Sequence, residues 1–149
     1  MAVTGDFAKF EAWKKFFKDI GASDFERDII TNAATACMKL IDEGFDKEQD
    51  PVNKSWEPKK RPNGLKVLEG PTKDLRSGFK LQFVSKDTFK ISNSVKYFRP
   101  HQYGANRNGT NWKLPKRQMM PTDGKLPPAY SDAFRSSCRK HWLKRLKKV

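Results

Sequence analysis

The sequence lacks the features that mark membrane, secreted and disulfide-stapled proteins. No apolar run approaches the ~18 residues that a membrane-spanning helix needs. The first residues contain no basic stretch followed by an apolar one, so we expect no secretory signal. Cysteine occurs only at Cys37 and Cys138, which is too few for a disulfide framework and suits a reducing compartment. At 149 residues the chain is expected to be a single cytosolic domain over 1–149.

Acidic side chains are scarce after residue 50. The first 50 residues hold 7 basic and 11 acidic side chains, whereas residues 51–149 hold 24 basic and 6 acidic ones, a net of +18. That net charge exceeds the magnitude of ~2–8 that suits a small domain. The asymmetry predicts an acidic end and a basic end that meet different partners, or each other in a neighbouring copy. The alternative is a solvated basic surface that maintains solubility.

Hydrophobic spacing predicts helices at both ends of the chain. Apolar residues recur every three or four positions over about residues 6–20, which indicates an amphipathic helix. A capping box of Ser23 and Glu26 begins the next helix, which we expect to end before Gly44 as its C-cap. A final helix over about 131–148 would be capped by Ser131 and carry on one side Phe134, Cys138, His141 or Trp142, and Leu146.

Between these helices the pattern changes to turns and strands. Prolines and turn pairs over residues 45–64 predict a long loop, unusual within a compact domain, that holds Trp56 as a partly exposed side chain. Alternating apolar residues predict a hairpin of strands 79–84 and 88–92, and a short edge strand at 112–114. The expected fold is therefore α+β: two N-terminal helices and a C-terminal helix packed on a small antiparallel sheet, with a long Pro-rich loop.

Little in the sequence points to catalysis. Cys138 and His141 could supply two metal ligands, but Cys37 and His101 lie on other elements and complete no recognised zinc spacing. No phosphate-cradling glycine loop is present. We therefore expect no enzyme, no cofactor and no metal.

Basic and aromatic residues alternate at several places in the second part of the chain. They do so at 96–99 and 112–113, and the last helix holds seven basic side chains and no acid from Arg135 to Lys148. Such patterns neutralise phosphates and stack bases, although the same aromatics also suit the core of a strand. Because no sequence-reading motif is present, the contact expected is a non-specific one with a DNA backbone. A monomeric, non-specific DNA-binding protein is accordingly the alternative function.

Several short motifs follow one another in a fixed order. A Trp-Glu-Pro segment at 56–58 precedes the segment 67–79, which begins Val-Leu-Glu-Gly-Pro and ends Ser-Gly-Phe. These are followed by His-Gln-Tyr-Gly at 101–104 and Leu-Pro-Lys-Arg at 114–117. Over about residues 25–121 this order resembles the virion-morphogenesis, or tail-completion, family of Mu-like tailed bacteriophages. Two positions depart from the family pattern: Lys73-Asp74 stands where a glycine is usual, and Phe98 replaces a small residue.

This resemblance implies a structural protein of the phage neck or tail end. Its subunit would act as a tail terminator or head-tail joining protein in a ring of about six copies, in contact with tail-tube and head-connector proteins. It would reside in the virion, after assembly in the host cytoplasm, and non-specific contact with genomic DNA remains open. The candidate interface residues are Trp56, His101, Tyr103, Arg117, Phe134, Arg139, Trp142 and Arg145. Arg117 is expected to pair with a carboxylate of a neighbouring subunit, unless the motifs only shape the fold of the monomer.

Overall fold

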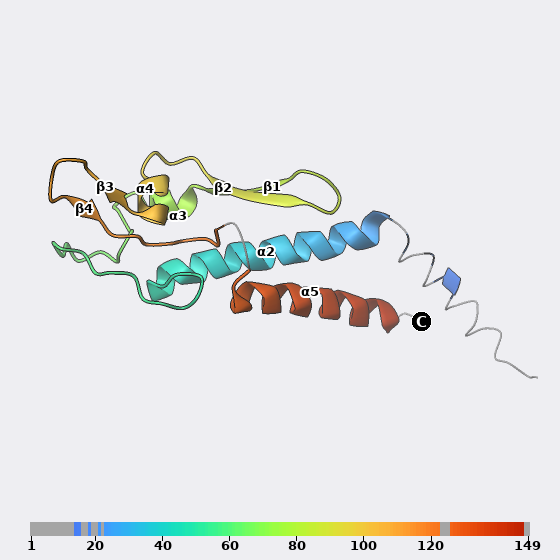
Figure 1. Cartoon of the computed structure of the whole chain (residues 1–149). Helices are drawn as coiled ribbons and strands as arrows, with labels where there is room; N and C mark the ends of the chain where they lie inside the picture. The colour runs from blue at the N-terminus through green and yellow to red at the C-terminus, as the bar shows by residue number, and fades with distance from the viewer. Residues whose placement is uncertain (1–13, 16–17, 19–20, 22, 123–125, 148–149) are drawn as a thin grey trace, which may run out of the picture.

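Two long antiparallel helices form the base of the structure. The computed structural model describes residues 14–15, 18, 21, 23–122 and 126–147. Helix α2 (Ser23–Lys47) and helix α5 (Pro128–Leu146) lie side by side, so that the end of α5 reaches the beginning of α2 (Figure 1). The helix expected over residues 6–20 lies outside the described residues, apart from residues 14, 15 and 18, which are helical.

The remaining elements are short and lie along α2 (Figure 1). Helix α3 (Asp74–Ser77) leads into strands β1 (Phe79–Phe83) and β2 (Phe89–Asn93), which pair antiparallel with Phe79 opposite Asn93. Helix α4 (Phe98–Tyr103) is followed by β3 (Ala105–Asn106) and β4 (Lys113–Leu114), also antiparallel. The predicted α+β class and the predicted hairpin are confirmed, and the strands form two separate two-stranded sheets.

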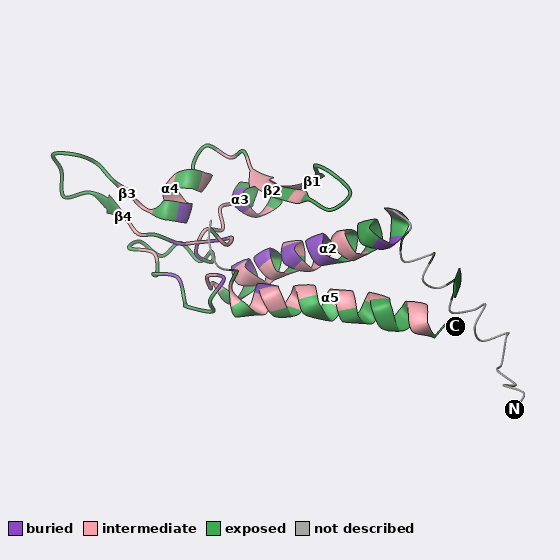
Figure 2. Ribbon diagram, turned by 45° about the vertical axis from the view of Figure 1, so that its right-hand side comes forward, coloured by how far each residue is buried: buried purple, intermediate pink, exposed green. Residues whose placement is uncertain are grey.

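Helix α2 supplies one side of the core. Figure 2 colours buried positions at intervals along this helix. The buried residues recur at helical spacing: Phe25, Ala33, Ala34, Cys37, Ile41 and Phe45. The prediction that Gly44 ends this helix is wrong, because α2 continues to Lys47. The extra turn buries Phe45, whose ring lies 5.4 Å from that of Trp56 and 6.0 Å from that of Phe79. Gly44 instead permits a close approach, since a Cβ there would lie 3.1 Å from the Gln49 carbonyl oxygen.

Helix α5 begins earlier than predicted. Its first residue is Pro128, and Pro127 occupies the N-cap, so the expected role of Ser131 as the cap is wrong. Proline suits the first helical position because it has no N–H that would lack a partner there and its φ is already helical. The Ser131 hydroxyl donates to the Pro128 carbonyl instead.

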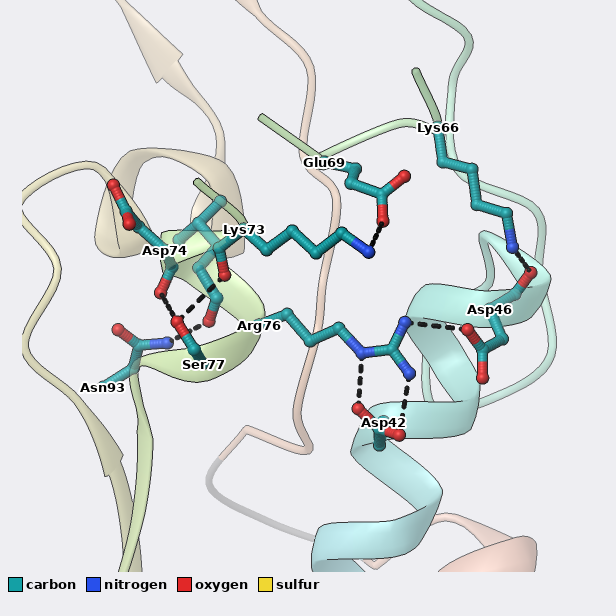
Figure 3. Close-up of polar contacts among 10 residues, drawn as sticks. Asp42, Asp46, Lys66, Glu69, Lys73, Asp74, Arg76, Ser77 and Asn93 are labelled. Carbon is teal, nitrogen blue, oxygen red and sulfur yellow. Dashed lines mark hydrogen bonds and ion pairs between the residues drawn. The ribbon is translucent and has the colours of Figure 1, made fainter. Parts of the chain in front are cut away.

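Acidic residues of α2 pair with basic residues of the same chain. Arg76 on α3 donates to the carboxylates of Asp42 and Asp46, with Arg76 Nη1 at 2.7 Å from Asp46 Oδ1 (Figure 3). The hydrogen bond from Arg76 lowers the pKa of Asp46 below its usual value. Asp28 lies 3.8 Å from the guanidinium of Arg145 on α5. The acidic and basic parts that the sequence distinguishes therefore meet within one subunit.

Candidate functional site

Three of the sequence motifs converge on one buried junction. Gln102, which is 1% exposed, connects two of them: its Oε1 accepts from the Met119 N–H at 2.8 Å and the Met120 N–H at 3.3 Å, and its Nε2 donates to the Met120 carbonyl at 2.7 Å. The Arg117 N–H donates to the His101 carbonyl at 2.8 Å. We call the joined segments 56–58, 101–104 and 114–120 the motif junction.

Arg117 lies inside this junction rather than on the surface. It is 7% exposed, and its Nε and Nη2 donate to the carbonyls of Glu57 at 2.8 Å and Pro58 at 3.1 Å. Burial lowers its pKa from the usual value, and the Glu57 carboxylate opposes that shift. The guanidinium therefore holds the chain's own 56–58 segment, and the expectation that it projects toward a neighbouring subunit is wrong.

Trp56 also belongs to the core. Its side chain is 6% exposed, and its indole N–H donates to the Gln118 carbonyl at 2.9 Å. The predicted partial exposure of Trp56 is therefore wrong in the single chain. Residues 48–73 contain no helix or strand apart from a bridge between Gln49 and Ser55, but this indole fastens the segment to the core.

The glycine of the His-Gln-Tyr-Gly motif has a steric role. Gly104 has φ +79° and ψ 163°, a region essentially restricted to glycine. A Cβ there would lie 3.3 Å from both the Leu114 carbonyl oxygen and the Lys116 nitrogen. Beside it, His101 has a lowered pKa because of burial and the nearby Arg117 charge. These positions shape the fold of the subunit, and only Tyr103, at 57% exposed, faces outward.

The candidate residues of the last helix divide into two groups. The Phe134 ring stacks on that of Phe89 with centroids 5.9 Å apart, and Arg145 lies 5.8 Å over the ring of Phe25, so both contact the rest of the subunit. Trp142 contacts Phe25 edge-on at 5.9 Å but remains 41% exposed, and Arg139 is exposed. The apolar side of α5 is thus covered largely by its own chain.

Sequence reasoning missed the apolar side chains at the ends of the two hairpins. Phe83 and Val84 are 46% and 64% exposed where β1 ends, and Trp112 is 52% exposed just before β4. The alternation of Phe79, Leu81 and Phe83 suggested a single buried face. Phe83, the last residue of β1, is exposed all the same, because an alternating pattern does not show which residues of a strand face are covered by another element.

Neither a metal site nor a membrane span is found within the described part of the chain. There, no three His, Cys, Asp or Glu side chains gather closely enough to hold an ion. None of the described helices has both the length and the apolar content to cross a bilayer.

No protein-family model, curated protein or solved structure matches the chain. The resemblance to tail-completion proteins therefore depends on the motifs themselves. The structure shows that three of these motifs, far apart in sequence, meet at one junction.

Proposed function

We propose that this chain is a structural protein of the neck or tail end of a tailed phage, a ring-forming tail-completion subunit rather than an enzyme. The order of motifs supplies the class of protein. The observation that carries the proposed assembly is that the turns of the two hairpins point in opposite directions (Figures 1 and 2), with exposed apolar side chains near each turn.

The two hairpin ends have the properties of contact surfaces. One is the β1–β2 end, with Phe83 and Val84, and the other is the β3–β4 end, with Trp112. Aromatic residues are enriched in the buried centres of protein interfaces. Each sheet has only two strands, so both strands of each sheet have an open edge that can pair with another chain.

Because the two hairpin ends point in opposite directions, they favour a ring over a symmetric dimer. When one surface of a subunit binds a different surface of the next, the contact repeats and closes if the rotation permits. We propose that the β1–β2 end of one subunit contacts the β3–β4 end of its neighbour. Partners at the tail tube and the head connector would meet the completed ring in the virion.

Charge has a smaller part in this contact than the sequence suggested. Several acids of α2 already pair with Arg76, Lys86 and Arg145 of the same chain. Apolar contacts at the hairpin ends should therefore govern assembly. Arg117→Glu is no test of it, because this change would break hydrogen bonds within the subunit.

Two variants that each block one end test the head-to-tail contact. Phe83→Ser with Val84→Ser blocks the β1–β2 end, and Trp112→Ser blocks the β3–β4 end. Each variant alone is expected to be monomeric by light scattering. An equal mixture is expected to form a one-to-one dimer, because each protein retains the end that the other lacks.

Val52→Ser provides the matched control, since Val52 is 60% exposed on neither hairpin. It should leave assembly unchanged. A mixture that remains monomeric while the unaltered chain assembles would contradict the head-to-tail contact, as would loss of assembly in the control variant.

A further inference from the structure

A groove between α2 and α5 is lined by hydrogen-bond donors and cations. Its volume is about 490 Å³. Its lining carries no acid among the residues that form it: Asn32, Ala36, Ala133, Ser136, Ser137, Lys140, His141 and Lys144. By contrast, another cavity, of about 430 Å³, includes both Asp50 and Glu57 in its wall. The α2–α5 groove is therefore suited to an anion.

The shape of the groove favours a chain of anions over a single one. Its lining on α5 extends from Ala133 to Lys144, which is about 16 Å of helix at 1.5 Å per residue. One DNA strand presents a phosphate for every ~3.4 Å along the helix axis, so several phosphates can pass along it. Lys140 and Lys144 lie one turn apart, about 6 Å along the axis, and both are exposed.

We propose that the α2–α5 groove binds the phosphodiester backbone of DNA. Lys140 and Lys144 neutralise its phosphates. The contact reads no base sequence, because its partners are backbone oxygens. This inference goes beyond the proposed ring and does not depend on the hairpin contacts.

Two double variants, each of which replaces two lysines by glutamine, distinguish binding in the groove from general attraction of DNA to a basic protein. Lys140→Gln with Lys144→Gln alters the groove, and Lys80→Gln with Lys90→Gln makes the same change on exposed residues of the β1–β2 hairpin. Both pairs lower the net charge of +14 by two. Binding to a short mixed-sequence duplex is measured by fluorescence anisotropy between 50 and 200 mM salt.

The groove variant should lose two phosphate contacts, so the slope of log K against log salt should become shallower by about 1.8. Between 50 and 200 mM salt, its affinity should therefore fall by a factor about twelvefold smaller than the factor for the unaltered protein. The hairpin variant should keep the original slope. Equal changes in both variants, or no change in either, would overturn the proposal.

Two further probes distinguish other anions. Polyglutamate and inorganic phosphate, each at matched ionic strength, should compete poorly with the duplex. If polyglutamate competes as well as DNA and depends on the same lysines, the groove binds an acidic protein instead. If inorganic phosphate alone binds with full dependence on Lys140, the groove holds a free anion. Either result would overturn the assignment to DNA.

Discussion

Replacement of Gln102 by Leu tests whether the motif junction holds the subunit together. The leucine has a similar size but makes none of the three hydrogen bonds of the amide. Met119 is 2% exposed, so its N–H would be left buried without a partner at a cost of about 1–3 kcal/mol. The Met120 carbonyl loses less, because Gln118 Nε2 still donates to it at 3.1 Å.

The partly buried groups of Met120 should add about 1 kcal/mol, which gives a total loss of about 2–4 kcal/mol. Such a loss is a large fraction of the ~5–15 kcal/mol that stabilises a typical domain. With an m-value of ~2 kcal/mol/M, the urea midpoint should fall by about 1–2 M.

The same substitution at Gln82 is the control. Gln82 lies on β1 and is exposed, so Gln82→Leu should change the free energy of unfolding by no more than about 0.5 kcal/mol. Urea unfolding followed by tryptophan fluorescence reports both variants, because Trp56 packs at the same junction. If Gln102→Leu costs no more than Gln82→Leu, the junction does not stabilise the fold.

Three other predictions follow from local geometry. Gly104→Ala should destabilise the fold by about 1–3 kcal/mol, measured by urea unfolding, because φ +79° and the crowded Cβ position both disfavour a side chain. The lowered pKa of Asp46 contributes stability above the unfolded-state value of ~3.9 that disappears as pH falls through the lower folded-state pKa. Arg76→Met should therefore flatten the acid limb of the stability–pH curve, and an unchanged limb would contradict this. Burial raises the pKa of the Cys37 thiol to about 11, so iodoacetamide at about pH 8 should alkylate the half-buried Cys138 first, as mass spectrometry of the folded chain can determine.

Local patterns predicted the elements that depend on near neighbours. The alternation of Phe79, Leu81 and Phe83 with polar residues places a strand correctly, because each strand face is set by residues two positions apart. The α2 helix was likewise expected from its spacing, although its last turn was not. That turn exists because Phe45 packs against Trp56 and Phe79, which no local pattern encodes.

Long-range contacts account for the errors at the candidate site. Arg117 and Trp56 were expected at an interface because arginine side chains, and large aromatic side chains in loops, are common at protein interfaces. Their partners lie about sixty residues away in the same chain, at Glu57, Pro58 and Gln118. A single sequence does not show such pairings. The motifs therefore marked positions that are important for the fold, while the exposed hairpin ends carried no recognisable motif.

The mass of the unaltered protein in solution tests the central claim, ring assembly through the hairpin ends, most directly. Light scattering coupled to size exclusion, over a range of protein concentrations, should give a discrete closed species of about six times the 17.2 kDa chain mass. This species should persist at high salt, because apolar contacts rather than charges govern it. A species of 17.2 kDa at every concentration and salt would contradict the account.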